Sequence, residues 1–253
     1  MDQPDQDQPL QEIETVWSDV LLAHLSEEEA HTARARLVLR YIGAVRRYMA
    51  RVLRDGDAAA ELAQEFAVRV LRGDFRRADP SRGRFRDFVR TAALNLVHDY
   101  RRRCKTRPPT RSVEASEPVA PQVESDELDA VFLRSWRSEL FGRTMAALAE
   151  YQRRTGRTYH DIISLRSSNP ELTSAQMAAL VSAQSGKPVS DVWVRQTLRR
   201  ARECLADLLL DEVSCSLENA SVEELEQELI SLDLLDYCYE GLRRRARRDQ
   251  ASG

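Results

Sequence analysis

The sequence predicts an all-α protein made of two small helical domains joined by a flexible linker. Apolar residues recur at helical spacing along most of the 253 residues, and no stretch alternates as a β-sheet does. The hydrophobic content of 42% is enough to form a core. Between residues 104 and 127, four prolines and no apolar periodicity predict the linker.

The first predicted domain covers residues 11–103 and follows a polar tail at residues 1–10, which we expect to be disordered. Turn-forming residues at 55–57 and 79–83 separate its helices. Apolar spacing and start signals predict four helices: residues 13–21, a helix after Ser26 that reaches Val52, one through residues 62–71 that stops at Gly73, and one from Phe85 to about Arg103.

The second predicted domain covers residues 128–213 and is followed by a helical extension at 214–253. The periodicity predicts helices near residues 128–152, 158–166, 173–183 and 190–210, and a further segment at 217–248. Four leucines mark the apolar side of that last segment: Leu225, Leu229, Leu232 and Leu235. Two interpretations of the extension stay open, a regulatory or partner-binding helix and a helix that packs on the second domain for stability.

Charge is strongly segregated along the chain although the net charge is only -3. Residues 1–33 carry nine acidic groups and no Lys or Arg, whereas residues 34–111 carry 21 basic and 8 acidic groups. A concentrated basic region, rather than the overall charge, indicates binding to a polyanion such as nucleic acid. Arginines on solvated helix faces are the alternative.

The composition and the motifs argue against catalysis, metal binding and membrane insertion. The four cysteines have no metal-ligand spacing, and the histidines lack partners for metal or acid–base work. The phosphate-binding, nucleophile-elbow and zinc-protease motifs are absent, so we expect no catalytic residues, no metal and no cofactor. With no signal peptide and no long apolar run, we expect a cytoplasmic protein that has no membrane partner.

The helix after Gly83 combines aromatic residues at its start with arginines along its length. Phe88, Ala92 and Leu96 recur at helical spacing and are predicted to be buried, while the arginines, Arg86 included, face outward. Phosphates attract arginine and unpaired bases stack on aromatic rings, so this helix favours single-stranded DNA. Phe85 and Phe88 are also ordinary core residues when each is taken alone.

This helix resembles the F-R-x-W-L…A-R-N-x-x-x-D-x-x-R pattern of sigma-70 family factors. The matching residues are Phe85-Arg86-x-Phe88-Val89 and Ala93-Leu94-Asn95-Leu96-x-x-Asp99-x-x-Arg102. Upstream, Glu61–Phe66 is similar to the D-L-x-Q-E-x-F segment by which these factors grip the polymerase clamp helices. The extracytoplasmic-function (ECF) type, which has only domains two and four, is the closest group. Residues 15–21 and 78–86 resemble a subgroup common in planctomycetes and related bacteria.

The second domain carries a predicted helix-turn-helix. Residues 173–180 form its first helix, with Met177 and Leu180 inward, and Ser190 caps the second helix at 191–202. Val194, Leu198 and Ala201 share one side of that helix, whose V-R-x-x-L-x-R-A-R ending resembles sigma domain four. The connection at 184–189 is longer than the usual tight turn, which leaves the helix crossing angle and the base-contacting set open.

The resemblance implies a sigma factor that binds core RNA polymerase and promoter DNA and supports promoter melting, with an anti-sigma or regulatory protein as a further partner. It implies three sets of site residues. The −10 set is Arg84, Phe85, Arg86, Arg90, Asn95, His98, Asp99, Arg101 and Arg102. The −35 set is Ser190, Trp193, Arg195, Gln196, Arg199, Arg200 and Arg202. The polymerase-binding set is Glu61, Leu62, Gln64, Glu65, Phe66 and Arg69.

Two other functional classes stay open. A helix-turn-helix regulator that never joins polymerase would share the basic charge but would not need the Glu61–Phe66 segment. A nucleic-acid enzyme would need inward-facing acids beside the basic helices, and the acids there are dispersed. We therefore expect a bacterial transcription-initiation protein that is not an enzyme.

Overall fold

The computed structural model describes residues 27–74, 84–106, 125–217 and 221–252. These residues form helices and short connections, and none of them lies in a strand, as the all-α prediction requires. The chain divides into two compact units, Met1–Phe132 with Ser214–Ala220 and Leu133–Val213 with Ser221–Gly253. Each unit is described by itself.

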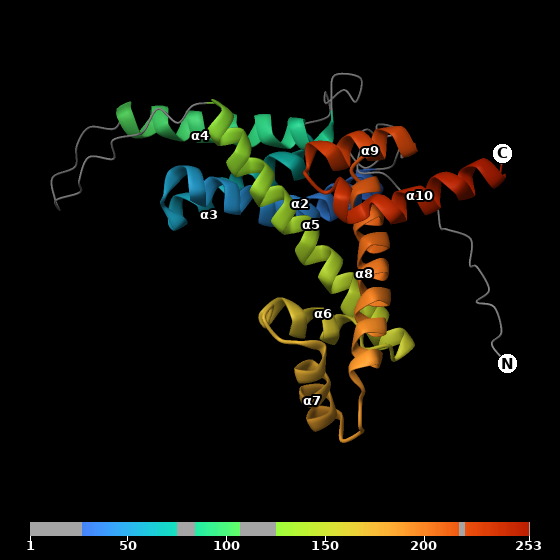
Figure 1. Ribbon diagram of the computed structural model, residues 1–253. Helices are drawn as coiled ribbons and strands as arrows, with labels where there is room; N and C mark the ends of the chain where they lie inside the picture. Colours follow the sequence, from blue (N-terminus) through green and yellow to red (C-terminus); the bar gives the residue numbers. More distant parts are fainter. Residues whose placement is uncertain (1–26, 75–83, 107–124, 218–220, 253) are drawn as a thin grey trace, which may run out of the picture. The chain divides into compact units, whose positions relative to one another are not determined.

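Three helices of the first unit correspond to the predicted first domain: α2 (Glu27–Leu53), α3 (Gly56–Arg72) and α4 (Phe85–Thr106) (Figure 1). Their ends follow from local chemistry. The Asp55 side chain accepts hydrogen bonds from the Asp57 and Ala58 amides at 3.0 and 3.1 Å, which satisfies two free donors at the start of α3. Gly73 ends α3 in the left-handed conformation at φ 77°, as predicted for this glycine.

Helix α2 packs against both α3 and α4, and aromatic side chains fill the space between the elements of this unit. The rings of Tyr41 and Phe85 lie 5.1 Å apart, and those of Tyr48 and Phe132 meet edge to face at 5.3 Å. Arg34 also donates a hydrogen bond to the Leu71 carbonyl oxygen at 3.1 Å, which joins the beginning of α2 to the end of α3.

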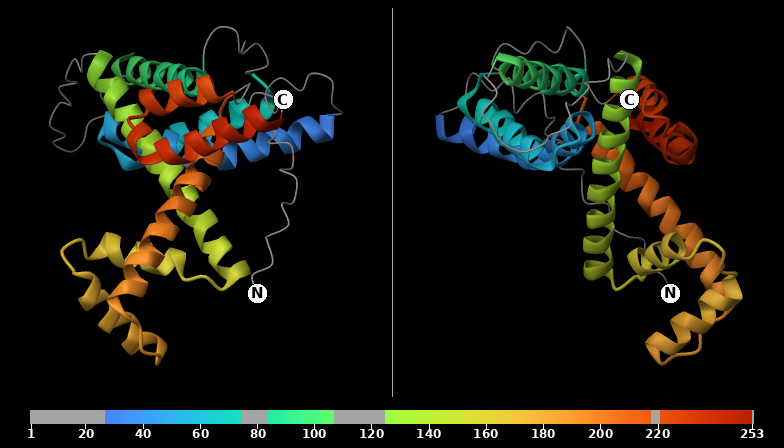
Figure 2. Two further views of the ribbon diagram at one scale, coloured as in Figure 1. Left: turned by 45° about the vertical axis from the view of Figure 1, so that its right-hand side comes forward. Right: turned by 90° about the vertical axis from the view of Figure 1, so that its left-hand side faces the viewer.

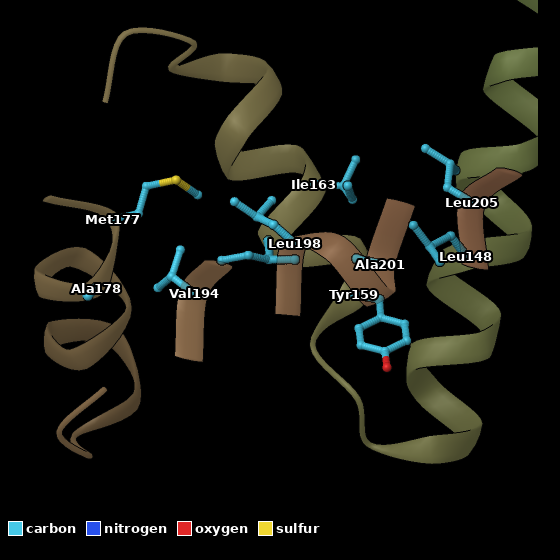
Figure 3. Packing of buried hydrophobic residues seen from close by; sticks show 10 residues of the cluster. Leu148, Tyr159, Ile163, Met177, Ala178, Val194, Leu198, Ala201 and Leu205 are labelled. Atoms are coloured by element: carbon cyan, nitrogen blue, oxygen red, sulfur yellow. The ribbon is translucent and has the colours of Figure 1, made fainter. Parts of the chain in front are cut away.

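The second unit contains the rest of α5 (Ser125–Thr155), which begins in the first unit, followed by α6 (Tyr159–Ser168), α7 (Ser174–Ser185) and most of α8 (Asp191–Ser214). Figure 3 shows side chains from these four helices meeting in one cluster. Its members are Leu148 of α5; Tyr159, Ile162 and Ile163 of α6; Met177 and Ala178 of α7; and Val194, Leu198, Ala201 and Leu205 of α8. This cluster fixes α7 and the first half of α8 relative to each other.

The extension forms two helices, α9 (Val222–Ser231) and α10 (Leu235–Ser252), rather than one segment. Asp233 takes a positive φ of 54° between them. Leu225, Leu229 and Leu232 of the predicted stripe are buried, whereas Leu235 is only half-buried. Helix α10 lies beside the second half of α8 (Figure 2), which is the packing that one interpretation of the extension requires.

Several predicted segments lie outside the described residues: the tail at 1–10, the helix at 13–21, the turn at 79–83 and most of the linker at 104–127. The structure corrects both ends of that linker, because α4 continues to Thr106 and α5 begins at Ser125. Asp126 and Glu127 lie in the first turn of α5, where carboxylates favour the positive end of the helix dipole. Among the helices that the structure describes, none has the length and apolar character needed to cross a bilayer.

Candidate nucleic-acid interface

Helix α3 divides the predicted polymerase-binding residues between its two sides. Glu61 and Gln64 are exposed, but Leu62 and Phe66 are 0% and 1% exposed and belong to the core. These two apolar side chains therefore have almost no surface to offer to a partner in this fold. Their spacing of four places them on the face that packs inside the unit. Val68, which is 42% exposed and four residues after Gln64, extends the outer face.

Glu65 links α3 to α4 at the edge of that outer face. Its carboxylate accepts hydrogen bonds from Arg69, one turn along α3, and from Arg103 of α4 at 3.2 Å. The Glu65 side chain is 29% exposed, so this cluster remains accessible to solvent. A partner that bound Glu65 would thus also affect Arg103.

Helix α4 buries Leu96 as predicted, but the rest of its buried stripe differs from the predicted one. Its most buried residues are Phe85, Val89, Ala93, Leu96 and Val97, whereas Phe88 and Ala92 are only half-buried. Arg86, expected to face outward, is only 6% exposed, and Phe85 is fully buried. The prediction that Arg86 faces outward is therefore wrong, and in this fold both side chains have almost no surface to offer to DNA. A core aromatic ring cannot stack on an incoming base without leaving its neighbours.

The outer face of α4 brings together three residues of the −10 set. Asn95, His98 and Arg102 are exposed at spacings of three and four, so they line one side of the helix. The Arg102 side chain is 79% exposed and donates to the Asp99 carboxylate at 3.1 Å. Thr91 lies four residues before Asn95 on the same face. Sequence reasoning missed it, although the helical repeat identifies it.

Two other arginines of α4 are held on its flanks. Arg101 donates to the Val52 carbonyl oxygen of α2 at 3.1 Å, and Arg90 forms an ion pair with Asp129 of α5. Burial, assisted by the negative charge of Asp129, raises the pKa of Tyr48 to about 12. Arg84, at the entrance of the helix, is half-buried. These contacts give Arg90 and Arg101 a structural role alongside any role at a ligand.

Local capping fixes α7 and α8 in the second unit. The Thr173 hydroxyl and the Gln176 side chain cap α7 reciprocally, and the Ser190 hydroxyl accepts from the Trp193 amide at 3.1 Å. This confirms Ser190 as the cap of α8. Met177 is fully buried as predicted, but the inward prediction for Leu180 is wrong because it is 42% exposed.

The charged side of α8 carries most of the −35 set. Val194, Leu198 and Ala201 are buried as predicted, and the exposed residues of the set are Ser190, Trp193, Arg195, Gln196, Arg199, Arg200 and Arg202. Arg195 donates to Asp191 at 2.6 Å, and Arg199 lies 3.8 Å from Glu203. These ion pairs leave both guanidinium groups exposed but restrict the conformations of the two arginine side chains.

Sequence reasoning missed Val192, whose side chain is 48% exposed in the first turn of α8. The signal for it was available, because Val192 precedes Gln196 by four residues and Arg199 by seven. As for metals, the described part of the chain contains no group of three or more His, Cys, Asp or Glu side chains that could hold an ion.

Comparison with known families bears on the first unit. Residues 37–107 match the family model Sigma-70 region 2. The match begins within α2, contains all of α3 and α4, and ends directly after α4. No curated protein and no solved structure matches the chain. The part of the first unit from α2 to α4 is therefore similar to Sigma-70 region 2.

Proposed function

We propose that this chain is a sigma factor of RNA polymerase of the ECF type, and that it belongs to the subgroup common in planctomycetes and related bacteria. The observation that carries the proposal is the Sigma-70 region 2 match across α2, α3 and α4. Such a factor acts in the cytoplasm, where polymerase and promoters are. The protein would bind core polymerase, open the −10 element and recognise the −35 element.

The outer face of α3 is the proposed surface for core polymerase. Glu61 and Gln64 offer polar side chains, Val68 offers an exposed apolar one, and Glu65 and Arg69 add a paired charge. Mixed polar and apolar surfaces of this kind are typical of protein–protein contacts. Leu62 and Phe66 support this face from the core.

The outer face of α4 is the proposed contact for the melted −10 strand. Asn95 and His98 offer hydrogen-bonding groups, and Arg102 offers a positive charge to the phosphates. Phe88 lies in the first turn of α4, and its ring centroid is 6.3 Å from that of Phe85. Phe88 is half-buried, so it is closer to the surface than the buried Phe85. Stacking of an unpaired base contributes roughly 1–3 kcal/mol, which would offset part of the cost of opening.

Helices α7 and α8 are the proposed helix-turn-helix, with α8 in the major groove of the −35 element. The shared core with α6 would hold α8 at a fixed angle, and its capped first turn would approach the base edges. A well-placed arginine on a guanine contributes about 1–3 kcal/mol of discrimination. The same arrangement would also serve a DNA-binding regulator that works without polymerase.

Run-off transcription tests the proposal. Tagged full-length protein with core polymerase would enrich genomic fragments, and these would serve as templates for core polymerase with and without the protein. Transcripts that start at one position only when the protein is added support a sigma factor. Core binding without any transcript contradicts it. Specific DNA binding without core binding assigns the chain to the regulators, and metal-dependent cleavage that EDTA abolishes assigns it to the enzymes.

Two double substitutions that add positive charge locate the polymerase surface in the same assay. Glu61→Arg with Gln64→Arg alters the outer face of α3 and should weaken core binding at least ten-fold. Glu223→Arg with Glu224→Arg alters exposed residues of α9 and is the matched control, which should leave core binding unchanged. Equal effects of the two pairs would contradict the assignment of α3.

A further inference from the structure

Helix α8 carries an exposed apolar residue at the centre of its charged side. Val192, Gln196 and Arg199 follow one another at spacings of four and three, so their side chains lie along one line of the helix. Val194, Leu198 and Ala201, which are buried, define the opposite side. Val192 is 48% exposed, so its isopropyl group is not used by the core of the unit.

The surroundings of Val192 indicate what could cover it. Exposed arginines follow it at positions 195, 199, 200 and 202, and a surface of this charge attracts a polyanion. The valine side chain has no donor or acceptor, so it gains only from contact with another apolar group. In the major groove of DNA, the apolar group on the base edges is the 5-methyl group of thymine.

The position of Val192 along α8 agrees with this occupant. Ser190 caps the helix through the Trp193 amide, so Val192 lies in the first turn with a defined backbone. The first turns of DNA-recognition helices are the parts that approach base edges most closely. We infer that Val192 is a specificity-determining residue that contacts a thymine methyl group in the bound duplex, an inference that rests on the proposed function of α8.

Replacing thymine by deoxyuridine tests this contact, because it removes the methyl group and keeps the hydrogen-bonding edge. The probe is a duplex that the full-length chain with core polymerase enriches from a randomised pool, with each thymine replaced in turn. At one position, deoxyuridine should weaken wild-type binding about four-fold, the effect of losing one buried methyl group. Val192→Ala should bind the thymine and deoxyuridine duplexes at that position equally well.

Ile230→Ala is the matched control, since Ile230 is a branched apolar residue of α9 that is 50% exposed. This variant should keep the full preference for thymine. An unchanged preference in Val192→Ala overturns the inference, and so does a loss of transcription with unaltered DNA binding, which would identify a protein surface as the occupant. If no duplex is enriched at all, the proposed function fails and the inference fails with it.

Discussion

Gly241 of α10 lies against Leu210 of α8 so closely that a Cβ atom on Gly241 would come within 2.7 Å of the Leu210 Cδ1 atom. The same Cβ atom would lie 2.9 Å from Asp207 Oδ1, which accepts a hydrogen bond from Arg244 at 2.8 Å. Arg245 forms a second ion pair with Asp211, one turn further along α8. Close contact of Gly241 with side chains of α8 and paired charges together join the extension to α8.

Gly241→Ala should destabilise the protein although alanine is the better helix former, because the Leu210 side chain is fully buried and has little room to move away from the new methyl group. Overpacking costs about 1–3 kcal/mol, which exceeds the gain of roughly 1 kcal/mol in helix propensity. Gly142→Ala in α5 is the control, because no atom lies within 4 Å of its added Cβ, and it should stabilise. Urea unfolding of both variants measures the difference. Equal stability changes would mean that α10 does not pack on α8 this closely.

Ser190 allows capping and DNA binding to be separated. Ser190→Ala removes the acceptor of the Trp193 amide and should lower the free energy of unfolding by about 1 kcal/mol. Ser190→Asp keeps an acceptor and should retain stability, but it adds a negative charge next to the phosphates. In thermal unfolding, Ser190→Ala should therefore be the more impaired of the two variants. In duplex binding, Ser190→Asp should be the more impaired. If Ser190→Asp bound duplex as well as the wild type, the start of α8 would not face DNA.

Neighbouring arginines of α4 should behave differently when replaced by alanine. Arg102→Ala removes an exposed charge, so it should weaken single-strand binding without loss of stability. The slope of log affinity against log salt concentration should become shallower by about one. Arg101→Ala removes the hydrogen bond to the Val52 carbonyl oxygen and should cost about 1 kcal/mol of stability. Binding titrations at several salt concentrations, together with thermal unfolding, measure both. Identical profiles would contradict the assignment of the outer face.

The cysteines should differ in reactivity. Burial raises the pKa of Cys204 to about 11 and that of Cys238 to about 12, so both hold their protons near pH 8, whereas the Cys104 side chain is exposed. Iodoacetamide should therefore label Cys104 first, as followed by mass spectrometry, and labelling in urea should remove the difference.

The same shifts affect stability at alkaline pH. Both folded-state pKa values lie above that of a thiol in the unfolded chain, so the unfolded state loses its protons first as the pH rises. The contribution of these thiols is complete below about pH 8 and decreases as the pH rises toward the folded values. Unfolding measured between about pH 8 and 10 should show this decrease, and Cys238→Ala should reduce it.

Local chemistry was sufficient to predict where many elements begin and end. Gly73 at the end of α3 and Ser190 at the start of α8 depend on backbone preferences and nearby hydrogen bonds, which neighbouring residues determine. The buried side of α8 was also correct, because Val194, Leu198 and Ala201 form an unambiguous stripe.

The sequence by itself thus determined the helical class, several helix limits and the separation of charge along the chain. Only the tertiary structure decided which side of α4 is buried, and therefore that Phe85 and Arg86 belong inside while Thr91 lies outside. The tertiary structure likewise places Leu62 in the core and leaves Leu180 exposed. The physical reason is that periodicity gives a helix an apolar side, but the helices packed against it fix how it is rotated within the fold.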